Sequence, residues 1–208
     1  VWCVTEGYAY DMFMNNTCMP LMIQIEGEYN SEGFETDGLD PLSRQAAGIA
    51  CYYTGPTVAI SKYPRIEYSG PWNKPCYADC YDEKDPYAPH VNRCPVVHVT
   101  DGSTVGYKYF NFRKTHGKKN LALEINFIPQ GKDAKVQVWV VRPNANEGGV
   151  KIGEFDISSS WSEKMRCQKI SVPSLASRNA KEALFFTFSS NAKEQSLCEI
   201  EDFRFVAD

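Results

Sequence analysis

The chain has 208 residues, of which 43% are hydrophobic and 23% charged, and this composition is typical of a globular protein rather than a disordered one. Its formal net charge of −4 argues against a nucleic-acid-binding protein, whose surface would carry a basic patch. No apolar run approaches the ~18 residues of a membrane-spanning helix, so we expect no membrane partner. Val1 is followed directly by Trp2 and Cys3, without a basic leader, so we expect any signal peptide to have been removed.

The first predicted strand covers residues 22–29. Ile23 and Ile25 alternate along it with polar residues and share one face, while Glu26 and Glu28 share the other. Two carboxylates on the same side of a strand repel each other unless a cation lies between them. The pair is therefore either part of a solvated face or a pair of metal ligands.

The next segment, residues 30–95, is a Cys- and Tyr-rich insertion with one further short strand expected over 49–53. Within it, residues 61–93 carry five prolines and show no regular pattern. A loop of this length inside a compact domain is usually functional or held by cross-links. We expect the insertion to be held by disulfides.

The chain contains eight cysteines, an even number spread without close metal spacing. This usage predicts four disulfides and an oxidising, extracellular compartment. Cys167 and Cys198 are the two that lie in the Phe-rich second part of the chain, so we expect them to pair. A zinc site is the alternative interpretation, with the ligands Cys76, Cys80, His90 and Cys94.

From residue 96 onward, apolar and polar residues alternate with the period of a strand, most clearly over 121–127, 135–141 and 184–188. Turns rich in Gly, Pro and Asn separate these segments, and no window keeps a helical period. The pattern predicts an all-β fold, a β-sandwich or jelly roll, in which Trp139 points to the outer face of its sheet. We expect one domain over 1–208, with an N-terminal extension (1–21), a first strand (22–29), the insertion (30–95) and the core sandwich (96–206).

Several segments resemble motifs of family 6 carbohydrate-binding modules. They are 26–29 (E-G-E-Y), similar to the opening strand E-A-E-x-Y; 101–112, similar to N-G-D-W-V-x-Y-x-x-F-D-F; 148–161, similar to G-G-x-x-I-G followed by G-W; and 198–205, similar to the closing strand C-N-I-D-W-F-x-F. Residues 22–60 also resemble the end of family 43 glycoside hydrolases that carry such a module. The sequence departs from the family in its long insertion and in Glu199, where the family has Asn.

The resemblance implies non-catalytic binding of a polysaccharide, xylan or a related neutral β-glycan, in a secreted protein that targets an attached or partner hydrolase to the plant cell wall. It also implies one structural Ca²⁺ that ties the first strand to the last, with Glu26, Glu28, Glu201 and Asp202 as oxygen ligands. We therefore expect no enzymatic activity. Two alternatives stay open: an extracellular structural or adhesion domain without a sugar site, and a remnant of a family 43 hydrolase.

For the sugar site the sequence offers Trp161, which lies in a wholly polar loop and matches the stacking Trp of the family. His98 stands where the family has a second aromatic wall, and it is equally well explained as a packed strand residue. Glu199 is placed to accept a hydrogen bond from a sugar hydroxyl, which argues for an uncharged ligand. Tyr77 and Tyr81 of the insertion either rebuild the missing wall or fill the space under the loop.

Overall fold

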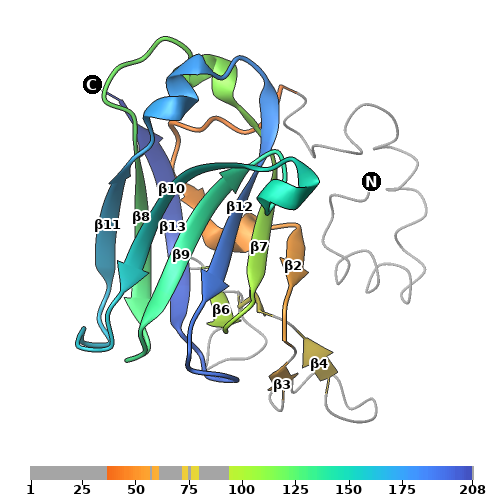
Figure 1. Cartoon of the computed structure of the whole chain (residues 1–208), viewed down its shortest axis with the longest axis vertical. Coiled ribbons are helices and arrows are strands. Elements are labelled where there is room, and N and C mark those ends of the chain that lie inside the picture. Colours follow the sequence, from red (N-terminus) through yellow and green to blue (C-terminus); the bar gives the residue numbers. More distant parts are fainter. Residues whose placement is uncertain (1–36, 57, 61–71, 75, 80–93, 208) are drawn as a thin grey trace, which may run out of the picture. The chain divides into compact units, whose positions relative to one another are not determined.

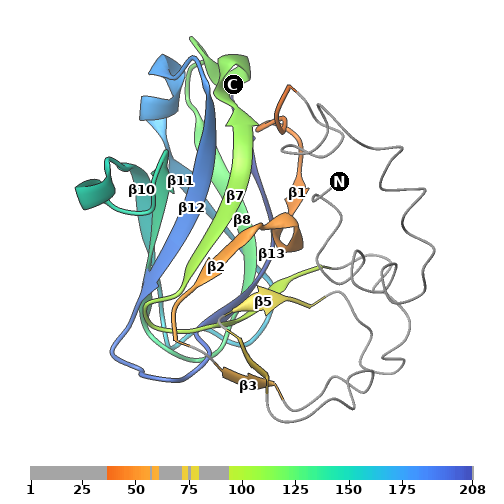
Figure 2. The same cartoon turned by 90° about the vertical axis from the view of Figure 1, so that its right-hand side faces the viewer.

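The structure is a computed structural model that describes residues 37–56, 58–60, 72–74, 76–79 and 94–207. Asp40–Asp208 forms one compact unit, built from two antiparallel sheets packed face to face (Figures 1 and 2). The predicted all-β sandwich is confirmed. In the described part of the chain the helical segments are short 3-10 turns, and none has the length and apolarity that a membrane-spanning helix needs.

The first sheet has the strand order β10-β9-β12-β7-β2 and faces the viewer in Figure 1. Its strands are β2 (Tyr52–Thr54), β7 (Thr104–Asn111), β9 (Ala134–Val140), β10 (Val150–Ile157) and β12 (Lys181–Ser189). The second sheet has the order β11-β8-β13-β6-β5, with β1 beside β13. Its strands are β1 (Gln45–Ala46), β5 (Tyr77–Ala78), β6 (Val96–Val99), β8 (Ala122–Pro129), β11 (Arg166–Ser171) and β13 (Cys198–Val206).

A separate two-stranded ladder joins β3 (Val58–Ile60) to β4 (Trp72–Lys74). The 3-10 turns are η1 (Ala47–Ile49), η2 (Phe112–Thr115), η3 (Ala145–Glu147) and η4 (Pro173–Ser177). Three sheet strands, β1, β2 and β5, come from the segment that the sequence presents as an insertion. The strand expected over 49–53 begins later, at Tyr52, because Ala50 N–H donates to Ala47 and closes a turn first.

The strands that alternate in sequence alternate in burial, since successive side chains of a strand point to opposite faces. Val136, Val138 and Val140 of β9 are fully buried. Trp139 between them points to the outer face, as predicted, and its indole N–H donates to the Thr187 hydroxyl at 3.1 Å.

The core between the sheets is aromatic. Phe203 of β13 is fully buried, and its ring centroid lies 4.8 Å from that of Tyr107 and 5.3 Å from that of Phe186 in the opposite sheet. Edge-to-face contacts of this kind stabilise a core beyond the area that they bury. The Phe-rich second part of the sequence therefore supplies the interior of the sandwich.

The predicted Cys167–Cys198 disulfide is wrong. β8 lies between β11 and β13, which separates the two cysteines by about 10 Å across the sheet, whereas a disulfide joins Cα atoms less than about 7 Å apart. Cys167 pairs with Asn126 and Cys198 with Pro129, so they also differ in level along the strands. The described residues contain four free cysteines: Cys51, Cys76, Cys167 and Cys198. The four-disulfide framework expected from the sequence is therefore not present.

Candidate functional site

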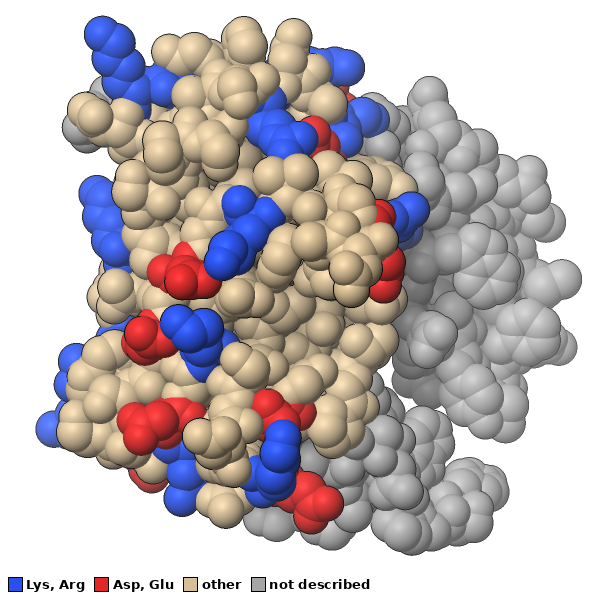
Figure 3. Space-filling model, viewed as in Figure 1, with Lys and Arg blue, Asp and Glu red and all other residues tan. Residues whose placement is uncertain are grey.

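An open hollow of about 410 Å³ lies on the outer face of the first sheet. Its floor comes from β7 and β12, one side from β2, and the other from the segment that follows β9. Figure 3 shows this face: Lys, Arg, Asp and Glu are mixed over it, with uncharged side chains between them. The sequence did not predict this hollow, which we call the sheet groove.

A row of aromatic side chains runs across the strands beside the sheet groove. Tyr52, Gly106, Phe185 and Trp139 are cross-strand neighbours on β2, β7, β12 and β9. The Tyr52 ring packs edge-on against Phe185, with centroids 5.9 Å apart. A Cβ atom at Gly106 would come within 2.7 Å of the Phe185 ring, so glycine is what allows this aromatic pair to close over the strand.

Tyr109 adds a second exposed ring to the sheet groove. Tyr52 and Tyr109 are 43% and 44% exposed, so each presents much of a ring to solvent. Both line the hollow. Exposed tyrosine rings with a polar hydroxyl are suited to the apolar faces and hydroxyl groups of sugars.

The wall after β9 is held rigidly. Val141 has φ +74°, a backbone region that β-branched residues adopt only under strain, and its N–H donates to Ala183. Asn144 accepts from the Glu147 N–H and donates to its carboxylate at 2.9 Å. Gly149 N–H returns to the Asn144 carbonyl at 2.8 Å. Strain of this kind gathers at functional sites, which makes this wall a candidate binding element.

Trp161 lies in the loop between β10 and β11, as the sequence indicates, and is half-buried. Its ring centroid is 6.2 Å from that of Phe127, a core residue. The Arg166 guanidinium carbon lies 4.7 Å from the centre of the ring, in cation–π contact. One face of the indole is therefore already occupied by a side chain of the protein.

The structure brings two other predicted sugar contacts together. His98, exposed on β6 at φ +55°, stacks on Tyr77 of β5, with ring centroids 5.4 Å apart and planes inclined by 22°. Glu199 on the neighbouring strand β13 accepts from the Gln130 amide at 3.4 Å. Glu199 pairs with Ile128, so the two side chains lie on the same face of the sheet. Trp161 contacts Phe127, the neighbour of Ile128 in the strand, whose side chain points to the other face. Glu199 and the Trp161 contact are therefore on opposite faces of the sheet. Tyr81 lies outside the described residues.

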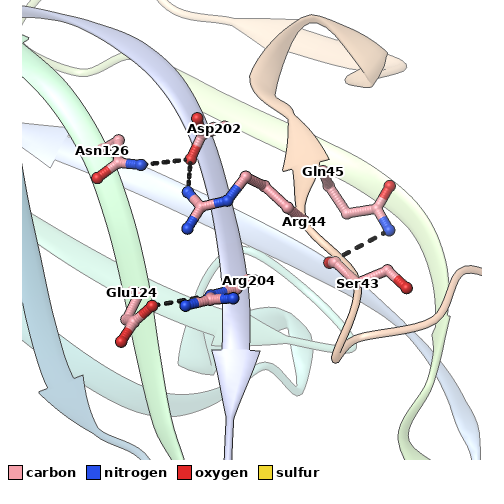
Figure 4. Close-up of polar contacts among 7 residues, drawn as sticks. All are labelled: Ser43, Arg44, Gln45, Glu124, Asn126, Asp202 and Arg204. Carbon is pink, nitrogen blue, oxygen red and sulfur yellow. Dashed lines mark hydrogen bonds and ion pairs between the residues drawn. The ribbon is translucent and has the colours of Figure 1, made fainter.

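The outer face of the second sheet carries ion pairs (Figure 4). Asp202 forms an ion pair with Arg44 and accepts from the Asn126 amide at 2.7 Å. Beside it, the Arg204 guanidinium donates to Glu124 at 2.8 Å and holds the pKa of that carboxyl below its usual value. These charges are neutralised within the protein.

Of the four predicted calcium ligands, Glu201 is buried and Asp202 faces a guanidinium. Glu26 and Glu28 lie outside the described residues. Among the residues that the structure describes, no three His, Cys, Asp or Glu side chains gather as a metal site requires. Cys80 and His90 of the zinc alternative are likewise not described.

Sequence reasoning missed the sheet groove because its residues are far apart in the chain. Phe185 alternates with the buried Leu184 and Phe186, and this alternation was the one available signal of an outward-facing aromatic on β12. No such signal marks Tyr52 or Arg142.

The sequence matches no protein-family model and no curated protein. Solved structures do match its fold. A family 6 carbohydrate-binding module from Clostridium cellulolyticum, in complex with xylose, aligns with a TM-score of 0.53 and 12% identity over 81% of this chain and 99% of its own. A second module, from Clostridium stercorarium in complex with cellobiose, aligns with a TM-score of 0.52 and 12% identity over 81% of this chain and 96% of its own.

A family 43 arabinoxylan arabinofuranohydrolase from Bacillus subtilis, in complex with cellotetraose, also aligns, with a TM-score of 0.53 and 15% identity. The match covers 82% of this chain but only 28% of the hydrolase chain. The protein described here thus has the β-sandwich fold of family 6 carbohydrate-binding modules.

Proposed function

We propose that this protein binds polysaccharide without catalysis, and that the sheet groove is its sugar-binding surface. The observation that carries the proposal is the pair of exposed tyrosines, Tyr52 and Tyr109, beside an open hollow on the outer face of a sheet. A β-linked glycan chain, extended and flat, would lay the apolar faces of its rings on these side chains. Xylan or a related β-glycan of the plant cell wall is the ligand class, because the neighbouring folds were solved with xylose and cello-oligosaccharides.

The carboxylates around the sheet groove fit a binding role. Glu182 forms an ion pair with Arg178 at 3.0 Å, and Glu147 accepts from Asn144. A glycosidase needs one carboxyl that stays protonated and another that is free to attack or activate water. Glu182 and Glu147 are both engaged by other side chains, which fits binding better than catalysis.

The proposed role of the protein is to hold an attached or partner hydrolase on its polysaccharide substrate in an extracellular setting.

The test uses a thiol that the chain already carries. Cys51 is free and lines the sheet groove, and partial burial raises the pKa of its thiol, so labelling requires mildly alkaline buffer. We expect the unlabelled protein to migrate more slowly in native gels that contain xylan than in gels without it. We expect labelling with a bulky maleimide to abolish this retardation.

Cys51→Ser is the matched control, because every other thiol of this variant reacts as in the parent chain. The labelled Cys51→Ser variant should still be retarded. If the labelled and unlabelled parent proteins are retarded equally, the sugar site does not lie in the sheet groove. No retardation of the unlabelled protein on any β-glycan would contradict polysaccharide binding itself and favour a structural or adhesion domain.

The loop edge around Trp161 is the second candidate surface. The face of the indole opposite Arg166 is the side on which a sugar would stack. His98 and Tyr77 form a ring pair that would serve as a further contact. This edge is the less favoured of the two surfaces because Trp161 is already engaged by Phe127 and Arg166.

Calcium binding stays a prediction for Glu201, together with Glu26 and Glu28; Asp202 is the weaker ligand because Arg44 already neutralises it. One Ca²⁺ at 100 times its dissociation constant stabilises a folded protein by about 2.7 kcal/mol, which is about 5–10 °C in Tm at this size. We therefore expect EDTA to lower the Tm of the parent by this amount and to leave that of Glu201→Gln unchanged. Identical melting of the parent in calcium and in EDTA would refute the site.

A further inference from the structure

The sheet groove is lined by more positive than negative charge. Three cations line it, Lys108, Arg142 and Lys181, each from a different part of the chain. Lys108 lies on β7 and Lys181 begins β12, while Arg142 follows the strained Val141. The excess is local, because the chain as a whole has a net charge of −4.

Each of the two acids that line the sheet groove has a partner other than Arg142. Glu182 forms an ion pair of 3.0 Å with Arg178, and the two side chains are only 13% and 21% exposed, respectively. Glu147 is tied by Asn144 through both its main-chain N–H and its carboxylate. Both carboxylates thus have partners of their own, and neither of these partners is Arg142.

Arg142 is exposed and forms no ion pair or hydrogen bond with its side chain among the described residues. Its backbone, by contrast, is held in place. A Cβ at Gly149 would lie 2.3 Å from the Arg142 carbonyl oxygen, so the backbone at residue 149 packs directly against the backbone at residue 142. The backbone that carries the guanidinium is therefore fixed, so that a ligand has to order only the side chain.

We propose that the sheet groove recognises an acidic polysaccharide, one whose β-linked backbone carries uronic acid carboxylates. The inference rests on the proposed function and names its ligand class. The tyrosine rings would hold the apolar ring faces, while the Arg142 guanidinium donates two parallel N–H bonds to one carboxylate. Lys108 and Lys181 contribute favourable charge from the floor of the sheet groove.

This ligand differs from the neutral glycan that the sequence indicates. That expectation rested on Glu199, which would repel a uronic acid, and Glu199 lies on the second sheet. Glu199 therefore does not belong to the sheet groove. An acidic glycan that Glu199 would repel meets an excess of cations at the sheet groove.

The test compares two forms of one polymer: glucuronoxylan, and the same polymer after its carboxyl groups have been reduced to alcohols. We expect the parent protein to bind the acidic form about tenfold more tightly at low ionic strength, and this preference to shrink at 0.5 M NaCl by screening. Arg142→Gln should lower the preference by about fivefold, the size of one exposed ion pair, because it weakens binding of the acidic polymer more than binding of the reduced one.

Lys169→Gln is the matched control, since it removes one positive charge from the second sheet and should leave the preference as it is. Equal affinity of the parent protein for the two polymers would overturn the inference and leave polysaccharide binding intact. An undiminished preference in Arg142→Gln, with the Tm unchanged, would overturn the role of this residue. If the parent binds neither polymer, the proposed function fails as well.

Discussion

Replacing Tyr52 and Tyr109 together by alanine is expected to lower the affinity for xylan about thirtyfold or more. The two rings are 43% and 44% exposed and supply the stacking surface of the sheet groove. Aromatic residues at the centre of a binding surface commonly contribute more than 2 kcal/mol each, although truncation values are not additive. The fold should persist, because neither ring belongs to the core. Titration calorimetry with xylo-oligosaccharides gives the affinity, and thermal melting checks the fold.

The control is the double variant Tyr52→Phe/Tyr109→Phe, which keeps both rings and removes only the hydroxyls. It should retain most of the affinity, since ring faces and not hydroxyls carry the stacking. Trp161→Ala is the companion variant for the loop edge. Loss of binding in Trp161→Ala, with full binding in the tyrosine-to-alanine variant, would place the sugar site at the loop edge and reject the sheet groove.

The second large effect concerns the core. Phe203→Ala is expected to lower the free energy of unfolding by about 3–5 kcal/mol, because the lost ring leaves a cavity among Tyr107, Phe110 and Phe186. At this chain length that loss corresponds to a fall in Tm of about 10 °C or more. Urea unfolding followed by tryptophan fluorescence measures it. Should the variant fail to fold, Phe203→Leu, which leaves a smaller cavity, gives an intermediate value.

Tyr107→Phe serves as the opposite test at the same place. The Tyr107 hydroxyl is buried and has no hydrogen-bond partner in the part of the chain that the structure describes, and burial raises its pKa well above the usual value. Removing a buried, unpaired hydroxyl while keeping the ring should raise the free energy of unfolding by about 1 kcal/mol. Destabilisation of this variant would mean that the hydroxyl does have a partner in solution, and with it that the packing around Phe203 differs from that described.

The ion pairs of the second sheet offer no comparable effect. Asp202 with Arg44 and Glu124 with Arg204 are partly exposed, and such pairs contribute little to stability. They do affect the surface: charges that are paired within the protein attract a charged ligand only weakly. On the first sheet, Lys135 with Asp156 and Lys151 with Glu154 are paired in the same way, whereas the Arg142 side chain at the sheet groove has no such partner among the described residues.

Much of the sandwich was predictable from local pattern. Apolar residues at every second position define a buried face wherever a strand forms, so the strands β8, β9 and β12 and the outward position of Trp139 follow from the sequence alone. The motifs of the closing strand and of residues 101–112 also pointed to the family whose fold the structure shares.

The disulfide prediction failed for a reason that no count of cysteines reveals. Whether two cysteines can pair depends on which strands separate them, and β8 stands between Cys167 and Cys198. Strand order results from long-range pairing, and residue spacing along the chain does not encode it.

The sequence by itself determined the all-β class, the faces of the long strands and the aromatic filling of the core, because a two-residue period is a local property of the backbone. Only the tertiary structure decided the surface that we propose to bind sugar. Tyr52, Tyr109, Arg142 and Phe185 come together because β2 pairs with β7 and β7 with β12, while a strained Val141 turns the chain beside them. Contacts between residues so far apart in sequence are set by sheet pairing, and this is why the sheet groove had no local signature.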